Sequence, residues 1–416
     1  MSTLNVPVVI HGVTGRMGQI AMAALQSIAQ NRSAKIDGDI IKPIPIGVGR
    51  NSEKLARIAK QYGLENYFSA VEPAIQLGRR LNKEYMVYHC TISTGIRRQV
   101  MLDVWPFLDA GSTALFMEKP LAPNYADGYA IVKAIEQKGF YNGVVHDMLS
   151  TPGVRKALEL LPRIKPLHAR MLFGYEVGAG LGGNKEYSGQ RPDFNWRLEE
   201  SGGGIILDMC HEGYLSKAFF GETEKLSSVA RLLVPQRLST DGKTIIDCNV
   251  EDYHALRRQH KNGVVNTSLW TWYRRVNSEF GPLEITIEGE DGTLVFGLYG
   301  LKVQWKETAP ANRWERSVTG GKIQWRDFWQ YEKIAYEDPF AFELVDFLQR
   351  YLRGEEYTMN AVHALDILGE VEAQYSSAAK DGVEIHCSDF LKYPKAVPEG
   401  WVAERLQGKL KGTSSS

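Results

Sequence analysis

The N-terminal segment follows the order strand, glycine-rich turn, helix, and this order restricts the folds open to the chain more than any other feature. Residues 6–11 form a short apolar run rich in β-branched side chains, and residues 19–29 carry apolar side chains at helical spacing. Between them lies the turn Gly12-Val13-Thr14-Gly15-Arg16-Met17-Gly18. The three segments predict the first βα unit of a dinucleotide-binding Rossmann sheet.

The turn itself suits a phosphate ligand. Glycines let the backbone approach a pyrophosphate closely, and a helix N-terminus offers unpaired N–H groups and a partial positive charge. The spacing is Gly-x-x-Gly-x-x-Gly, so the loop is one residue longer than the usual dinucleotide turn. The residues of this turn that we expect to bind the cofactor are Gly12, Thr14, Gly15, Arg16, Met17 and Gly18.

The end of the second predicted strand, over residues 43–48, bears on the choice of cofactor. Folds that bind NAD usually place an acid here to accept hydrogen bonds from the ribose, but this chain has Gly49 followed by Arg50 and Asn51. An arginine suits the 2′-phosphate of NADP. We therefore expect NADP or NAD, with NADP favoured and held by Arg50 and Asn51. The alternative is that Arg50 is a solvated residue before a helix over 53–62.

Two later motifs carry side chains suited to catalysis. A buried strand over 114–117 runs directly into Glu118-Lys119-Pro120, at the strand end where parallel sheets place ligands. Three glycines at 202–204 open a predicted helix over 205–220, in which Asp208 and His211 lie at i and i+3 on one face. A histidine held by a carboxylate has a fixed tautomer and a raised pKa, which suits proton exchange near neutral pH.

The second half of the chain has a different pattern. Strand-like alternation is found at 168–175, 229–234, 252–256, 263–273, 283–288, 293–297 and 301–307, followed by helical segments at 341–353 and 360–379. We expect an α/β protein with an N-terminal Rossmann domain over 1–149, an α+β domain with a large, mostly antiparallel open sheet over 150–395, and a tail over 396–416. Trp270 and Trp272 share one strand face, either as core or as part of an interface.

Composition excludes several classes of function. The formal net charge of the 416 residues is zero, which gives no reason to expect a nucleic acid or an anionic membrane as partner. The N-terminus has no signal-peptide pattern, and no apolar run reaches the roughly 18–20 residues of a membrane span. The four cysteines are scattered, without the spacing of a metal site, so we expect reduced thiols, a cytoplasmic location and no metal.

Taken together, the Gly-rich turn, Glu118-Lys119-Pro120 and the segment from Gly202 to His211 resemble the glucose–fructose oxidoreductase / inositol dehydrogenase (Gfo/Idh/MocA) family of NAD(P)-dependent sugar dehydrogenases. The resemblance covers about residues 5–390. It implies a sugar or polyol substrate and a homodimer or homotetramer formed through the C-terminal sheet. It also implies that Glu118 lies near the nicotinamide, that Lys119 reaches the reacting oxygen, that His211 is the general base, and that Asp208 orients it or binds a hydroxyl.

The resemblance suggests further contacts and shows some departures. It implies that Thr91 borders the nicotinamide ribose, and that His146, Trp196 and Arg197 are candidates for substrate contact. The segment over 174–189 is too rich in glycine for a helix or strand, and we expect it to be a mobile loop near the site. In the loop that starts at Cys90-Thr91 the family's proline is absent, and Arg97 stands near the place of its histidine. Tyr214 stands where the family often has a second aspartate, which indicates a different substrate or subgroup.

Two other functions remain open at this stage. Some proteins that resemble this fold hydrolyse glycosides through a transient oxidation by bound NAD, although those alter the lysine that this chain keeps. The second alternative is a regulator that senses the cofactor and has no catalytic activity. The presence of Lys119, Asp208 and His211 argues against it. The sequence Gly15-Arg16-Met17-Gly18 also resembles the phosphate loop of dihydrodipicolinate reductase, but the paired-histidine motif of that enzyme is absent.

Overall fold

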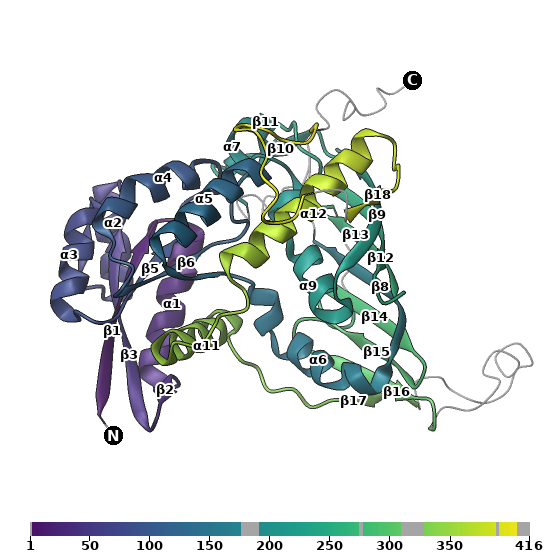
Figure 1. Ribbon diagram of the computed structural model, residues 1–416, viewed down its shortest axis with the longest axis horizontal. Coiled ribbons are helices and arrows are strands. Elements are labelled where there is room, and N and C mark those ends of the chain that lie inside the picture. Colours follow the sequence, from purple (N-terminus) through teal and green to yellow (C-terminus); the bar gives the residue numbers. More distant parts are fainter. Residues whose placement is uncertain (1, 176–190, 274–277, 309–327, 388–390, 406–416) are drawn as a thin grey trace, which may run out of the picture.

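The computed structural model describes residues 2–175, 191–273, 278–308, 328–387 and 391–405. Figure 1 shows two sheets, one at each side of the molecule, with helices between and around them. The predicted fold class, a Rossmann domain followed by an α+β domain with a large open sheet, is confirmed. Residues 176–190 and 406–416, which include most of the predicted loop and the end of the tail, lie outside the described part.

The N-terminal sheet has seven strands in the order β2-β3-β1-β5-β6-β7, with β4 beside β3. Apart from the antiparallel β2–β3 pair, its strands run parallel, as a Rossmann sheet requires. Its elements are β1 (Thr3–His11), α1 (Arg16–Asn31), β2 (Lys35–Ile36), β3 (Asp39–Val48), α2 (Ser52–Tyr62), β4 (Tyr67–Phe68), α3 (Val71–Leu81), β5 (Met86–Cys90), α4 (Arg97–Val104), β6 (Thr113–Met117), α5 (Tyr125–Lys138) and β7 (Tyr141–Val144).

The second sheet has nine strands in the order β17-β16-β15-β14-β8-β13-β12-β9-β18, and within it only β8 and β13 pair in parallel. Its strands are β8 (Pro166–Gly174), β9 (Thr223–Arg231), β12 (Tyr253–His260), β13 (Val265–Thr271), β14 (Leu283–Gly289), β15 (Gly292–Phe296), β16 (Leu301–Trp305), β17 (Gln330–Tyr331) and β18 (Ile385–His386). A separate hairpin pairs β10 (Gln236–Leu238) with β11 (Ile245–Asp247).

The helices of the second half are α6 (Pro152–Ile164), α7 (Leu198–Ser201), α8 (Ile205–Asp208), α9 (His211–Phe220), α11 (Pro339–Arg353) and α12 (Ala361–Ala379). In Figure 1, α6, α9 and α12 lie between the two sheets. Trp270 and Trp272 are 1% and 0% exposed, and their rings contact Phe173 and Trp196. The core interpretation of these two tryptophans is therefore the right one, since buried side chains cannot meet another copy of the chain.

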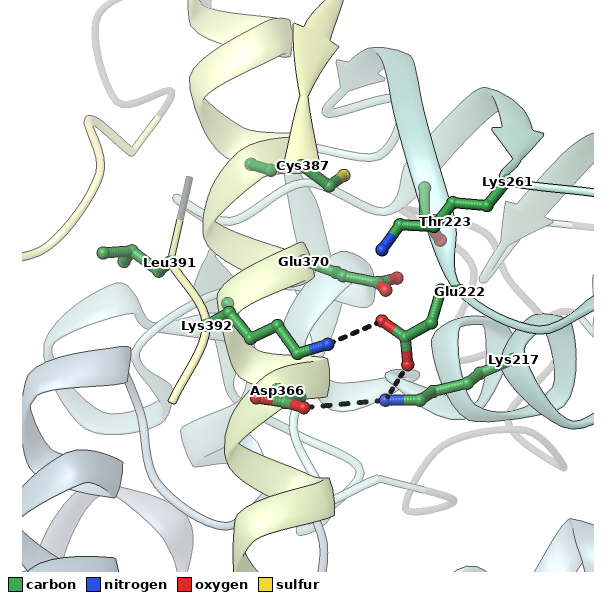
Figure 2. Close-up of a pocket in the computed structure, with 11 residues that line it drawn as sticks. Lys217, Glu222, Thr223, Lys261, Asp366, Glu370, Cys387, Leu391 and Lys392 are labelled. Atoms are coloured by element: carbon green, nitrogen blue, oxygen red, sulfur yellow. Dashed lines mark hydrogen bonds and ion pairs between the residues drawn. The ribbon is translucent and has the colours of Figure 1, made fainter. Parts of the chain in front are cut away.

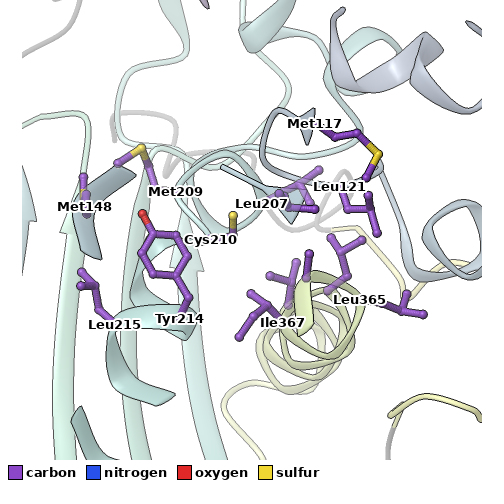
Figure 3. Packing of buried hydrophobic residues seen from close by; sticks show 14 of the residues in the cluster. Met117, Leu121, Met148, Leu207, Met209, Cys210, Tyr214, Leu215, Leu365 and Ile367 are labelled. Atoms are coloured by element: carbon purple, nitrogen blue, oxygen red, sulfur yellow. The ribbon is translucent and has the colours of Figure 1, made fainter. Parts of the chain in front are cut away.

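The last two helices return to the N-terminal domain. Asp338 caps α11 by accepting hydrogen bonds from the main chain of Phe340 and Ala341, and Phe347 on this helix packs against Phe116 of β6 with ring centroids 4.4 Å apart. Helix α12 crosses the junction of the domains. Figure 3 shows its Leu365 close to Leu121, which follows β6, and to Leu207 of α8. One continuous apolar core therefore joins the two domains and holds the ends of the Rossmann strands against α8 and α9.

The predicted helix over 205–220 is broken, which corrects the arrangement expected for its side chains. Helix α8 ends at Asp208 and α9 begins at His211, because Met209 has a non-helical backbone (φ −100°, ψ 41°). The turn is closed by hydrogen bonds of 3.3 Å between residues three apart, from the main-chain N–H of Cys210 to the oxygen of Leu207 and from that of Glu212 to the oxygen of Met209. Asp208 and His211 therefore do not share a helix face, and the pairing expected from their spacing does not form.

Candidate active site

A cavity of about 590 Å³ lies between the carboxyl ends of the Rossmann strands and the second domain. Its volume is within the range typical of cofactor and substrate sites. The Rossmann side supplies the Gly-rich turn and the ends of β5 and β6, and the other wall comes from 173–175, 191–195 and the α8–α9 junction. Of the predicted site residues, those that line the cavity are Gly15, Arg16, Met17, Thr91, Glu118, Lys119, Asp208 and His211.

The Gly-rich turn has the close contacts that a phosphate loop needs. Gly12 has φ +104°, a conformation that favours glycine, and a Cβ added there would lie 2.7 Å from Oγ1 of Thr91. A Cβ added at Gly18 would lie 2.4 Å from the carbonyl oxygen of Gly12, so only glycine lets α1 start this close to the loop. No side chain caps the N-terminus of α1, which leaves its first N–H groups for an anion.

The region after β3 fits the cofactor prediction only in part. A Cβ added at Gly49 would lie 2.7 Å from Cγ2 of Thr14, so an acid at this position would crowd the loop. Asn51 accepts a hydrogen bond from the main chain of Lys54 at 2.8 Å and thereby caps α2. Arg50 is exposed and does not line the described cavities, whereas Lys54 lines both the main cavity and an adjoining open groove that Thr14 also borders. Lys54 is a cation that the sequence reasoning missed.

Lys119 and Asp208 meet across the cavity, although 89 residues separate them in the chain. The Nζ of Lys119 donates a hydrogen bond to the main-chain oxygen of Asp208 at 2.7 Å and lies 3.4 Å from its Oδ1. The other carboxylate oxygen of Asp208 accepts from Arg191, so the acid lies between two cations. Burial is the main cause that lowers the pKa of Lys119, and the nearby Arg191 acts in the same direction.

Arg191 is the second cation that sequence reasoning missed. Its side chain is only 10% exposed, donates to the hydroxyl of Tyr175 at 3.0 Å, and lies over the ring of Trp272 at 4.4 Å from the centroid. It follows the glycine-rich stretch directly, and no local motif marks it. Only the fold brings it to Asp208.

His211 contacts groups other than the predicted Asp208. Its Nδ1 is hydrogen-bonded to the hydroxyl of Tyr214 and lies 3.8 Å from Oδ1 of Asp147, the residue that follows β7 and His146. The prediction of a raised pKa is wrong, because burial and, after it, the charge of Lys119 lower the pKa of His211 well below its usual value. Burial also raises the pKa of Asp147 to about 6, against the opposing attraction of Lys119.

Arg97 holds the loop that carries Lys119, and Glu118 lies buried beside His89. Glu118 is 3% exposed, and its Oε1 lies 3.8 Å from Nε2 of His89. The buried guanidinium of Arg97 donates to the main-chain oxygens of Ile92, Glu118, Pro120 and Leu121. Arg97, which stands near the expected place of a histidine, therefore fixes the course of the chain on both sides of Lys119. Thr91, which follows β5, donates through Oγ1 to the main-chain oxygen of His11 at 2.9 Å and so bonds the end of β1, which leads into the Gly-rich turn.

The three candidates for substrate contact lie outside the described lining of the cavity, so the structure does not support that role. His146 is 2% exposed, its Nδ1 is 2.6 Å from the main-chain oxygen of Val144, and burial lowers its pKa to about 4. Trp196 is buried between Trp272 and Arg237. Arg197 is 47% exposed and pairs with Glu200. The family resemblance pointed to Arg197 because a Trp-Arg pair precedes the three glycines, but the structure leaves this side chain about half exposed and outside the cavity lining.

A second, much smaller cavity of about 50 Å³ lies beside α12 at the edge of the large sheet. Figure 2 shows that four of its charged side chains pair with one another: Lys217 lies 3.0 Å from Glu222 and 3.6 Å from Asp366, and Lys392 lies 2.9 Å from Glu222. These pairs tie the segment after β18 to α9 and α12. Within the described ranges, no group of three metal-ligating side chains forms a cluster, and no helix combines the length and hydropathy that a bilayer crossing requires.

Comparison with known proteins agrees with this geometry. A family model described as "GFO/IDH/MocA C-terminal domain" matches residues 171–295. The D-xylose dehydrogenase of Paenarthrobacter nicotinovorans is 26% identical over 376 residues, which cover 87% of this chain and 92% of that protein.

Solved structures of a levoglucosan dehydrogenase have the same fold. Its complex with NADH and L-sorbose superposes with a TM-score of 0.72 at 17% identity, covering 92% of this chain and 98% of the other. Its complex with NADH and levoglucosan gives 0.71 at 18% identity, covering 93% and 100%. Together with the Rossmann loop and the lysine and histidine that line one cavity, these matches confirm the resemblance to the Gfo/Idh/MocA family of oxidoreductases, whose C-terminal domain model covers residues 171–295 of this chain.

Proposed function

We propose that this protein is an NAD(P)-dependent dehydrogenase that oxidises a secondary alcohol of a sugar or polyol, or reduces the corresponding ketone. The observation that carries the proposal is the single cavity that Lys119, Asp208 and His211 line together and that also reaches the Gly-rich turn. Two observations on similar proteins support it: the relatives are named for sugars, and the solved levoglucosan dehydrogenase forms complexes with NADH.

The residues of the turn fit a dinucleotide. The close packing at Gly12 and Gly18 and the uncapped start of α1 form a backbone cradle for a pyrophosphate. When bound, the nicotinamide supplies the acceptor or donor of the hydride. Glu118, Lys119 and Thr91 line the same cavity and are the side chains that we expect beside the ring and its ribose.

Lys119 and His211 would have different roles at the substrate oxygen: the lysine would stabilise its negative charge, and the histidine would accept its proton. The ammonium of Lys119 is held by Asp208, and in a largely buried site it would stabilise negative charge on the oxygen strongly. The lowered pKa of His211 keeps its imidazole neutral near pH 7, so the ring can accept the hydroxyl proton as oxidation proceeds. Asp208, bound to both Lys119 and Arg191, is placed to orient the lysine rather than the histidine.

We further propose that NADP is the favoured cofactor. Gly49 leaves no acid to accept from a ribose hydroxyl, and Arg50 and Lys54 supply positive charge close to the turn. The neighbours solved with NADH make NAD the competing possibility. We also expect a homodimer or homotetramer built through the open face of the large sheet, and a cytoplasmic location in keeping with the free cysteines Cys90, Cys210, Cys248 and Cys387.

The test is a spectrophotometric assay of purified protein with NAD and NADP in parallel against pentoses, hexoses, anhydrosugars, polyols and sugar acids. Reduction of either cofactor by a neutral sugar or polyol supports the proposal and gives the cofactor ratio. Absence of turnover over the whole panel, with nucleotide retained on the protein, would contradict it. That result would favour a glycoside hydrolase with an internal redox cycle or a nucleotide-sensing regulator.

A further inference from the structure

We propose that Asp147 is a positioning residue for the general base: it holds His211 in the tautomer that carries its proton on Nδ1, and it stabilises the imidazolium that forms when Nε2 takes the substrate proton. The inference rests on the proposed function. It concerns a residue that no sequence motif marked, and the evidence for it is the geometry around His211.

The position of Asp147 in the fold makes this contact possible. The residue begins the 3₁₀ turn Asp147–Ser150 after β7, at the same sheet edge as Lys119. His211 begins α9 immediately after the break that separates it from Asp208. Asp147 lines the cavity, and its Oδ1 lies 3.8 Å from Nδ1 of His211.

The tautomer follows from the two neighbours of Nδ1. A carboxylate repels the lone pair of a ring nitrogen and attracts an N–H, so an ionised Asp147 favours the proton on Nδ1. The hydroxyl of Tyr214 can donate to a ring nitrogen or accept from it, and it therefore does not choose the tautomer alone. With Nδ1 protonated, Nε2 carries the lone pair that can accept a proton from substrate.

Asp147 also stabilises the positive charge that forms on the ring of His211 during the reaction. His211 is buried near the cations Lys119 and Arg191, both of which oppose a second positive charge on its ring. The alcohol O–H bond breaks as the N–H bond at Nε2 forms, and the hydride leaves the carbon for the nicotinamide, so the ring gains one positive charge. A carboxylate 3.8 Å from Nδ1 offsets that charge.

The groups that face Asp147 come from several elements and set the pH range of this role. They are Glu118 and Lys119 at the end of β6, Cys210, His211 and Tyr214 at the start of α9, Tyr299 between β15 and β16, and Glu343 on α11. Burial raises the pKa of Asp147 to about 6, so the carboxylate is lost as the pH falls through this value. His211 has a much lower pKa and does not titrate in that range.

The experiment compares Asp147→Asn with the wild type in two readouts. The first is ¹⁵N NMR of ring-labelled histidine, in which the signal of His211 is identified among the nine histidines by its loss in His211→Gln. The second is steady-state kinetics against pH. The control is Asp346→Asn, which removes a half-exposed acid paired with Arg350 on α11, outside the cavity.

We expect the wild type to show a proton on Nδ1 and Asp147→Asn to lose that preference. We also expect kcat of the variant to fall by about 10²-fold, with KM nearly unchanged, and the acid limb near pH 6 to disappear. Asp147→Glu should restore part of kcat. An unchanged tautomer together with wild-type turnover would overturn the proposal, as would a raised KM at constant kcat, which would make Asp147 a substrate ligand. The NMR result does not depend on turnover, so it separates this proposal from failure of the dehydrogenase function.

Discussion

Replacement of Gly18 by alanine tests whether the N-terminal turn is the cofactor cradle. A Cβ at this position would lie 2.4 Å from the oxygen of Gly12, 2.6 Å from Cα of Val13 and 2.8 Å from the carbonyl carbon of Gly12. All three neighbours are backbone atoms, which cannot rotate away as a side chain could. Ordinary contacts begin near 3.4 Å, so the first turn of α1 must move away from the loop by about 1 Å.

Two effects of that displacement can be estimated. Overpacking of this kind costs about 1–3 kcal/mol of stability, which lowers Tm by several degrees. A 1 Å displacement also weakens the N–H contacts that the helix start would offer a pyrophosphate. Each hydrogen bond to a charged group is worth about 1.5–3 kcal/mol, so loss of one raises the Kd of the dinucleotide by about 10–100-fold.

The assay is a fluorescence titration of Gly18→Ala with NAD and NADP, alongside thermal unfolding. The matched control is Gly111→Ala in the loop before β6, where an added Cβ would have its nearest neighbour at 3.7 Å, an ordinary contact. We expect the control to bind both dinucleotides as the wild type does. Wild-type affinity in Gly18→Ala, with its Tm lowered as estimated, would refute the assignment of the turn to the pyrophosphate.

Four further substitutions test other parts of the site. Lys119→Ala should leave dinucleotide affinity nearly intact while kcat falls by about 10²-fold or more, because the removed charge acts on the reacting oxygen. An equal loss of nucleotide binding in titrations would instead assign Lys119 to the cofactor. Arg50→Ala should weaken NADP about tenfold more than NAD, and an unchanged ratio of the two Kd values would remove the case for NADP. Arg191→Ala should lower kcat/KM by about tenfold or more, because Asp208 loses one of its two cations. Arg197→Ala removes an exposed ion pair and should change kcat/KM by less than about twofold. If steady-state kinetics gave the reverse order, Arg197 would be the arginine that contacts substrate.

Much of the fold was readable in the sequence because its signals are local. The Gly-rich turn, the strand before Glu118 and helix α11 carry their own periodicity, turn residues and caps, and the structure has them close to the predicted bounds. The strands of the large sheet were recognisable for the same reason, since alternation along one strand does not depend on its partners. The single parallel pair, β8 with β13, joins segments far apart in sequence and could not be read from either strand.

The site was less predictable because its contacts are between distant segments. Lys119 was identified from its motif, but its partner Asp208 lies 89 residues away, and the motif around Asp208 indicated His211 instead. The break at Met209 separates these two residues, and no proline or glycine in the sequence marks it. Arg191 and Asp147 lie in segments without a motif, so only the packing of the two domains shows that they line the cavity.

The central claim is that the cavity around Lys119 and His211 oxidises a sugar or polyol with a nicotinamide cofactor. The most direct test is absorbance at the band of the reduced nicotinamide, with wild type and Lys119→Ala assayed side by side over the sugar panel. The account predicts that the wild type reduces NAD or NADP with at least one sugar or polyol, and that the variant binds the same cofactor but turns over about 10²-fold more slowly. Equal turnover by the two proteins, or none by the wild type while its cofactor remains bound, would contradict it.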